Sequence, residues 1–452
     1  MGKSMIVMKF GGTSVGTAEA MKQVAAIIQN DVRKKKVVVL SACSGITNKL
    51  LYLAKKSAYI DEQERILLIE EIIHFHSDII FSLGINSSIL DAQFDLITKE
   101  IYEFCEGISL LGECTPRSLD RLSSFGELLS TLIFSEYVKG IGLHAELVNA
   151  LSFMKTDSTY TSAHIQYDSM IQEIQKTIIP KCEHNDIIIT QGFIGSDEHD
   201  IVTTLGRGGS DFSAALIGMA IEAQEIVIWT DVSGIASADP KLISHAHTIE
   251  KMSFQEARLL SFFGAKVLHP ETILPAIKHN IPVIVKNTFS PHDKGTTIVS
   301  DSSYSESNII SITSKNAVGL VEFTHQTFSI TQKMSIIGEF LDTLQCDLYA
   351  FGCLENTMYA VISLDRINFL SKAESLKDWE ISYKDQSFIA AIGPNKVSDK
   401  CPDILSTFNQ IICQHNLMPI LLSGISEYAL CAVIDQKSLH QTLISLHSEL
   451  IE

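Results

Sequence analysis

The sequence predicts an α/β protein with a layered N-terminal domain and two small C-terminal modules. Apolar, β-prone runs alternate with helical stretches over the first 290 or so residues. The composition then shifts at 287–308 to a segment rich in Ser, Asp, Thr and Gly, which is typical of a linker between domains. Beyond it, short strands accompany two helices, and YAVI at 359–362 recurs as CAVI at 431–434.

The bulk composition restricts the class of protein. With 452 residues, 46% of them hydrophobic and 19% charged, the chain can bury several cores, and a length prior suggests roughly three domains. The net charge of −18 disfavours nucleic acid and anionic membranes as partners. Nine cysteines without C-x-x-C spacing are typical of reduced core thiols, which favours a cytoplasmic location. The sequence contains no apolar run of about 18 residues, so it predicts no membrane span.

The elements of the N-terminal domain follow from periodicity. The predicted strands are 5–10, 36–42, 145–149, 186–191, 225–230 and 281–286. The predicted helices are 17–33, 45–58, 61–83, 91–107, 117–139, 168–178, 211–223, 253–262 and 271–279. Residues 61–107 look purely helical, because isoleucines recur there at spacings of three and four, and we interpret them as an inserted helical pair.

The C-terminal part predicts two ferredoxin-like modules. Helices at 332–343 and 403–416 each stand before one of the two repeated strands. The order strand, helix, strand, strand, helix is that of a small ligand-sensing or interaction module. Two such modules indicate regulation or oligomerisation.

The stretch KFGGTSVG at 9–16 carries a cation at the end of a buried strand. Lys9 stands among apolar residues, and Gly11 and Gly12 follow at once. A Gly-Gly turn exposes backbone N–H groups, and a lysine beside them favours an anion such as phosphate. The alternative is a strand-end lysine that reaches solvent beside an ordinary turn.

The stretch TTLGRGGSD at 203–211 predicts a second anion site. Three glycines around Arg207 form a flexible loop that leads into a helix, whose free N–H groups and dipole attract an anion. The guanidinium adds a planar fork matched to a carboxylate or phosphate. Asp211 lies in the first helical turn, where the dipole alone would account for an acidic residue.

Seven motifs together resemble the aspartate kinases of the amino-acid kinase superfamily. In chain order they are KFGGTSVG (9–16), VVVLSACSGITN (37–48), SFGELLS (124–130), ITQGFIG (189–195), TTLGRGGSD (203–211), WTDVSGI (229–235) and FGAKVLHP (263–270). The resemblance implies an amino-acid-kinase-type α/β/α sandwich with a mainly parallel central sheet in residues 1–299, which includes the helical insertion 61–107. It also implies a first ACT module at 316–383 and a second one made of 300–315 and 384–452.

The resemblance implies ATP-dependent phosphorylation of the β-carboxylate of L-aspartate to 4-phospho-L-aspartate, the first step toward lysine, threonine and methionine. A carboxylate with a pKa of about 3.9 is already ionised at neutral pH, so no general base is needed. The implied catalytic residues are Lys9, Arg207 and Asp211. The implied aspartate-binding residues are Ser41, Thr47, Glu127, Phe193, Thr204, Arg207 and Gly208. Without the resemblance, Glu127 would be interpreted as a solvated acid on a helix.

The implied ATP-binding residues are Lys9, Gly11, Gly12, Thr230, Asp231, Ala236, Lys241, Lys266 and Val267. Two of them depart from the family pattern, because Ala236 stands where many relatives have Tyr and Lys241 where they often have Arg. A lysine keeps the charge but lacks the bidentate fork. Mg²⁺ is expected to be held mainly by ATP, without a dedicated metal site in the protein.

Regulation and partners are likewise implied by the resemblance. An amino-acid effector, lysine first, is expected near 328–340, and the ACT modules are expected to form a homodimer or a dimer of dimers. Two alternatives remain: another amino-acid kinase that acts on glutamate or N-acetylglutamate, and an inactive amino-acid sensor. The acidic Glu127 suits a free ammonium group and would be a poor partner for an acetylated nitrogen.

Overall fold

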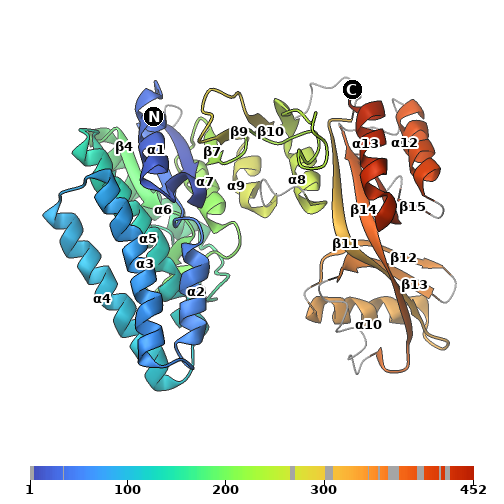
Figure 1. Cartoon of the computed structure of the whole chain (residues 1–452), viewed down its shortest axis with the longest axis horizontal. Coiled ribbons are helices and arrows are strands. Elements are labelled where there is room, and N and C mark those ends of the chain that lie inside the picture. Colours follow the sequence, from blue (N-terminus) through green and yellow to red (C-terminus); the bar gives the residue numbers. More distant parts are fainter. Residues whose placement is uncertain are drawn as a thin grey trace. The chain divides into compact units, whose positions relative to one another are not determined.

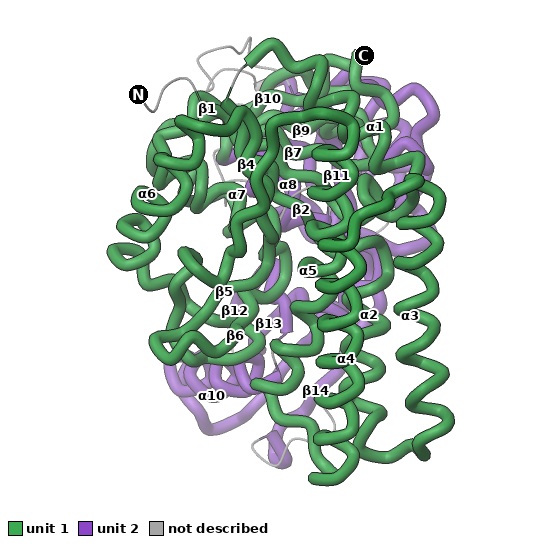
Figure 2. Tube along the Cα trace, turned by 90° about the vertical axis from the view of Figure 1, so that its left-hand side faces the viewer, with its two compact units in different colours: residues 1–235, 248–254, 267–301 green, residues 236–247, 255–266, 302–452 purple. Residues whose placement is uncertain are grey.

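The computed structural model describes residues 5–33, 35–264, 270–300, 309–344, 346–354, 357–364, 376–393, 402–416, 419–422 and 428–452. The chain forms two compact units, coloured separately in Figure 2. Unit 1 comprises residues 1–235, 248–254 and 267–301, and unit 2 comprises 236–247, 255–266 and 302–452. Two segments that precede the linker therefore belong to unit 2, and the sequence-based domain boundaries stay a prediction.

Unit 1 is built on an eight-stranded sheet in the order β3-β4-β2-β1-β7-β9-β10-β8. All neighbours run parallel except β9 and β10. The strands are β1 (Met5–Phe10), β2 (Lys35–Leu40), β3 (Ala145–Leu147), β4 (Ile187–Gln191), β7 (Ile226–Thr230), β8 (Lys251–Ser253), β9 (Val283–Asn287) and β10 (Thr296–Val299). A separate two-stranded antiparallel sheet consists of β5 (Ile194–Ser196) and β6 (Val202–Thr204), which lie between β4 and β7 in the sequence.

Helices cover both faces of the large sheet, because its central strands are apolar on both sides. Ile6, Met8 and Phe10 of β1 join a core with the helices α1 to α5. Val7 points to the opposite face, where a side chain at Gly218 of α7 would touch it. The predicted α/β/α sandwich with a mainly parallel sheet is confirmed.

The helices of unit 1 begin mostly at polar N-caps. They are α1 (Ala18–Asn30), α2 (Ile46–Lys56), α3 (Glu62–Leu83), α4 (Ser88–Leu111), α5 (Pro116–Gly140), α6 (Tyr167–His184), α7 (Gly209–Ala220) and α9 (Leu274–Lys278). The helix α8 (Phe254–Phe262) falls almost wholly in unit 2. The expected helical pair is α3 and α4, capped by Asp61 and Ser87, and it lies beside α5 (Figure 1). Both helices contribute to the same core as β1.

Unit 2 is built on a six-stranded antiparallel sheet in the order β12-β13-β11-β14-β16-β15. Its strands are β11 (Ser311–Thr324), β12 (Leu348–Leu354), β13 (Thr357–Ser363), β14 (Glu380–Ile392), β15 (Ile420–Leu421) and β16 (Ala429–Asp435). Its other helices are α10 (Ile330–Thr343), α12 (Pro402–His415) and α13 (Leu439–Leu450). The long strand β11 pairs with β14 on both sides of a bulge between Lys315 and Val318.

Two separate cores show that unit 2 contains two modules. One core joins Phe323 of β11, Ile337 of α10 and Met358 of β13. The other joins Ile389 of β14 to helices α12 and α13. The two predicted ferredoxin-like modules are thus confirmed as a fold. In the part of the chain that the structure describes, no helix is long and apolar enough to cross a bilayer.

Candidate active site

One cavity of about 400 Å³ opens in unit 1 at the carboxyl ends of the parallel strands. It is lined by the end of β1, by the turns after β1, β2 and β4, by Glu127 of α5, and by the beginnings of α2 and α7. The structure brings together there nine residues that the sequence singled out: Lys9, Gly12, Ser41, Thr47, Glu127, Phe193, Arg207, Gly208 and Asp211. In open α/β sheets, ligands bind at this edge, where the strand order reverses, and β1 is the strand at the reversal.

The turn after β1 lies close to the turn after β2. A Cβ atom at Gly12 would stand 2.8 Å from the carbonyl oxygen of Ala42, so only glycine permits this approach. The N–H of Ser44 donates to the carbonyl of Gly12, and the N–H of Gly11 donates to Trp229. The Gly-Gly turn therefore fixes the end of β1 between its two neighbouring strands.

The alternative interpretation placed the Lys9 side chain in solvent, but the structure does not. Its Nζ lies 2.7 Å from Oδ1 of Asp211, and both side chains are largely buried. Asp211 does occupy the first turn of α7, so it is stabilised by the helix dipole as well as by the lysine. The ion pair holds one cation at the floor of the cavity.

Arg207 lies in the loop that leads into α7. Gly206 and Gly208 have φ values of 76° and 70°, a conformation that side-chain-bearing residues rarely adopt. Phe193, also at a positive φ of 67°, packs against Gly209, where a Cβ would come within 2.8 Å of its ring. The Arg207 side chain is exposed, and within the described residues its guanidinium has no ion-pair partner. It is therefore available to a ligand.

Two helices begin at the cavity without a side-chain cap. The N-cap of α2 is Gly45, at φ 82°, and the N-cap of α7 is Gly208. Uncapped helix N-termini leave N–H groups that bind anions readily. Sequence reasoning missed the lining residues Ala42, Cys43, Ser44, Gly45, Asn48 and Ser210, whereas Gly206 and Gly209 belong to the glycine-rich loop that it predicted as an anion site. Gly45, the first residue of the predicted helix at 45–58, was the available signal for several of them.

Glu127 is the buried anion of the cavity. Its side chain comes from α5, only 3% of the residue is exposed, and Oε1 accepts from the Ala42 N–H at 3.1 Å. Its Oε2 atom is buried without a hydrogen-bond partner among the described residues. Burial raises the pKa of Glu127 to about 8, despite the hydrogen bond from Ala42. A cationic group would restore its charge and satisfy the second oxygen.

The other predicted site residues lie elsewhere. The hydroxyl of Thr204 donates to Asp120 at 2.7 Å and does not line the cavity. Gly11 lies next to the lysine, since a Cβ there would stand 3.6 Å from the Lys9 Nζ. Thr230 is the last residue of β7, the strand next to β1, and Asp231 follows it. Of the remaining four, Ala236 and Lys241 belong to unit 2, whereas Lys266 and Val267 lie outside the described residues.

Comparison with known proteins gives the family. The sequence profile of the amino acid kinase family matches residues 4–287. The chain belongs to the amino acid kinase family. Among curated relatives of this amino acid kinase, the lysine-sensitive aspartokinase 3 of Escherichia coli strain K12 is 30% identical over 470 residues, which cover 99% of both chains. The chloroplastic aspartokinase 1 of Arabidopsis thaliana is 34% identical over 362 residues, 76% of this chain and 62% of the plant protein.

Solved structures extend the similarity to both units of the amino acid kinase. The E. coli aspartokinase III in complex with aspartate and ADP, in the R-state, superposes with a TM-score of 0.83 at 28% identity, over 99% of this chain and 100% of the other. The same enzyme in complex with lysine and aspartate, in the T-state, gives a TM-score of 0.85 at 29% identity over 100% of both chains.

The buried carboxyl of Glu127 predicts a pH-dependent cost in stability. Its pKa is about 8 in the folded kinase against an ordinary value of 4.5, so the wild type loses stability as the pH rises through this window. Glu127→Gln, which does not titrate, is expected to be more stable at pH 8 by on the order of a few kcal/mol and nearly equal at pH 5. Urea unfolding at both pH values measures the difference.

Glu136, on the same helix, is the matched control. The hydrogen bonds from Lys139 and Ser87 outweigh its desolvation and lower its pKa. Glu136→Gln should therefore lower stability at pH 8 and lose this effect as the pH falls below the ordinary carboxyl range. A gain at pH 8 in both variants, or in neither, would contradict the charge states assigned to Glu127.

Proposed function

We propose that this protein is an aspartate kinase, which transfers the γ-phosphoryl group of ATP to the β-carboxylate of L-aspartate. One observation carries the proposal: a single cavity combines the buried, half-satisfied carboxyl of Glu127 with two cations, Lys9 and Arg207. An amino acid that is phosphorylated on its side-chain carboxylate needs an anionic partner for its ammonium group, a cation for its α-carboxylate and a second cation for the transferred phosphoryl group. The relatives named as aspartokinases, one of them solved with aspartate and ADP, support this choice of substrate.

Each charged group has a distinct role in the proposed complex. Arg207 binds the α-carboxylate through two of its N–H groups, and Glu127 accepts from the ammonium. The β-carboxylate, already ionised, then attacks the γ-phosphorus, and the bond to the β,γ-bridging oxygen breaks to release ADP. Lys9 and the N–H groups at the start of α7 stabilise the charge that develops on the transferred group. Ser41, Thr47, Phe193 and Gly208 complete the aspartate pocket, whereas Thr204 supports it through Asp120.

ATP is proposed to lie toward the end of β7, where Thr230 and Asp231 are. Within the described residues, the cavity is lined by only two carboxylates, Glu127 and Asp211. Since Glu127 is assigned to the ammonium and Asp211 is paired with Lys9, this donor set suits a Mg²⁺ ion held mainly by ATP oxygens and water. Mg²⁺ would then neutralise phosphate charge without a cage of protein ligands.

The substrate is tested by ADP release with four acceptors: L-aspartate, L-glutamate, N-acetyl-L-glutamate and N-acetyl-L-aspartate. We expect rapid release with L-aspartate and none with the two acetylated acceptors, because an acetylated nitrogen is uncharged and leaves Glu127 without a cation; faster turnover of L-glutamate than of L-aspartate would contradict the proposed substrate. Faster turnover of an acetylated acceptor would indicate a different amino-acid kinase. No release with any acceptor would instead favour the inactive sensor.

We also propose that L-lysine inhibits the enzyme through the ACT modules, as the name of the E. coli relative and its lysine-bound structure suggest. The implied segment 328–340 contains the start of α10, whose capping box joins Ser329 and Gln332. Self-association through these modules and a cytoplasmic location stay predictions.

Ser329→Ala is expected to weaken lysine inhibition. The change removes a cap worth about 1 kcal/mol, so the half-inhibitory lysine concentration should rise roughly fivefold while kcat stays unchanged. Inhibition curves with lysine, threonine and methionine check both the effector and the segment. An unchanged lysine curve in the variant would show that the start of α10 is not part of the effector site.

A further inference from the structure

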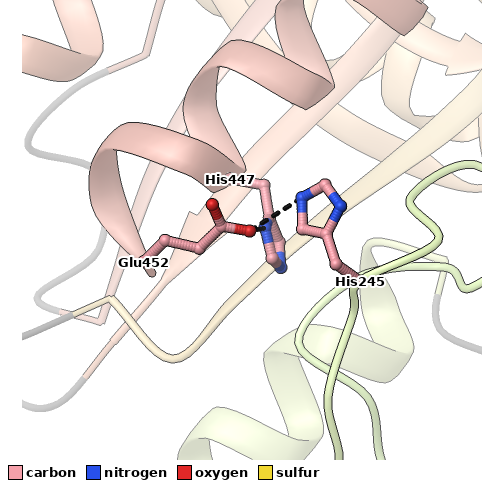
Figure 3. Close-up of side chains that lie close together, drawn as sticks. All are labelled: His245, His447 and Glu452. Carbon is pink, nitrogen blue, oxygen red and sulfur yellow. Dashed lines mark ion pairs between the residues drawn. The ribbon is translucent and has the colours of Figure 1, made fainter.

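Three ligand-forming side chains meet in unit 2, although they are far apart in the sequence. They are His245 of the segment 236–247, His447 of α13, and Glu452 just beyond that helix (Figure 3). Nε2 of His245 lies 2.7 Å from Oε1 of Glu452, and Nδ1 of His447 lies 3.5 Å from the same oxygen. Among the described residues, this is the one group of three such side chains whose ligand atoms all lie within 4.8 Å of one another.

His447 is the unusual member of the group. Its side chain is fully buried, and Nδ1 has no hydrogen-bond partner in the part of the chain that the structure describes. Figure 3 shows this ring directed toward His245 and Glu452. A buried polar atom without a hydrogen bond costs stability, so its retention indicates a partner that the protein itself does not supply.

The opposite nitrogen of His447 is held by a serine. Nε2 lies 2.9 Å from Oγ of Ser237, which also accepts from the N–H of His247. If Nε2–H donates to this oxygen, the lone pair of Nδ1 points into the group. Histidine ligands of metals are commonly fixed in this way by a hydrogen bond from their other nitrogen.

The three side chains are held by ordered structure. The N–H of Glu452 donates to the carbonyl of His447, which places the carboxylate beside the end of α13. Within unit 2, Ile243 packs in the same core as Leu443 of α13, so the segment with His245 is anchored next to that helix. The side chains of His245 and Glu452 are 50% and 45% exposed, so an ion can reach the group from solvent.

We propose that His245, His447 and Glu452 bind a divalent transition-metal ion of the Zn²⁺ class, with water as the fourth ligand. Two imidazoles and one carboxylate form a donor set that Zn²⁺ accepts, and bonds of about 2.0–2.1 Å place tetrahedral ligands about 3.3 Å apart. The 3.5 Å separation already matches this spacing. The 2.7 Å pair must open slightly to admit the ion.

An ion pair between protonated His245 and Glu452 is the simpler alternative. It explains the shortest distance in the group, but it leaves Nδ1 of His447 without a hydrogen-bond partner among the described residues.

The test uses the full chain after treatment with a chelator and its removal. Isothermal titration with ZnCl₂ should give one bound equivalent. His245→Asn and Glu452→Gln, both at half-exposed positions, should each weaken this binding by at least ~10-fold. With CoCl₂ as a second probe, the wild type should develop the visible absorption of tetrahedral Co²⁺, and both variants should lose it.

His164→Asn is the matched control, because His164 forms an exposed pair with Asp157 at 2.9 Å but has no third ligand-forming side chain close to that pair among the described residues. It should bind Zn²⁺ like the wild type. The proposal is overturned if the wild type binds no Zn²⁺, or if His245→Asn and Glu452→Gln bind it as tightly as the wild type does.

Discussion

Lys9→Ala is expected to lower kcat by ~10²–10³-fold, the usual cost of removing one preorganised charge that stabilises a transition state. Lys9 is the cation on the cavity floor, held by Asp211 at 2.7 Å beside the N-terminus of α7. Because its charge matters most as the phosphoryl group moves, the KM for L-aspartate should change little. Steady-state ADP release at saturating ATP measures kcat.

Two controls separate this effect from misfolding. Lys176→Ala removes a lysine that also forms an ion pair, with Glu173, but on an exposed helix face, and it should leave kcat unchanged. A Lys9→Ala/Asp211→Asn double variant removes the unpaired carboxylate that the single change leaves behind. A near-normal kcat in Lys9→Ala would disprove its role at the transition state. A lower melting temperature that accompanies the loss of activity would instead indicate a folding defect.

Arg207→Ala is expected to raise the KM for L-aspartate by ~10²-fold and to leave the KM for ATP nearly unchanged. The loss corresponds to one charge-assisted, bidentate pair with a carboxylate, of about 3 kcal/mol. Because Arg207 is exposed in a glycine-rich loop, the change should not affect stability. Separate titrations of aspartate and ATP give the two constants.

Arg207→Lys keeps the charge but lacks the planar fork, so its KM for aspartate should lie between those of the wild type and the alanine variant. Equal effects of Arg207→Ala on both substrates would contradict its assignment to the α-carboxylate. A wild-type KM for aspartate in Arg207→Lys would also contradict this assignment, because the bidentate geometry of arginine would then be irrelevant.

Much of the fold could be predicted because long apolar runs and helical periodicity reflect burial directly. The central strands β1, β2, β4 and β7 follow from such runs. The strands β5, β6 and β8 have only three residues each, too few to show a period. The helix α6 extends to His184, beyond its predicted end at 178 and through Pro180, because the buried Cys182 continues its apolar face.

The site could be predicted where a local motif encodes it. Lys9 with its two glycines, and Arg207 with its three, indicate anion sites from the sequence alone. Glu127 required the family resemblance, because nothing in its local sequence distinguishes a buried acid from a solvated one. His245 and His447 are brought together only by tertiary structure, so no local pattern could have indicated them.

The central claim is that Glu127 and the two cations of one cavity select a dicarboxylic substrate that carries an ammonium group. The most direct measurement is kcat/KM for L-aspartate and for succinate, which lacks only the amino group, in the wild type and in Glu127→Gln. We expect the wild type to prefer aspartate. In Glu127→Gln the ratio of kcat/KM for aspartate to that for succinate should fall by ~10²–10³-fold, because the ammonium group of aspartate is then buried without an anionic partner. An unchanged preference in Glu127→Gln would contradict the account.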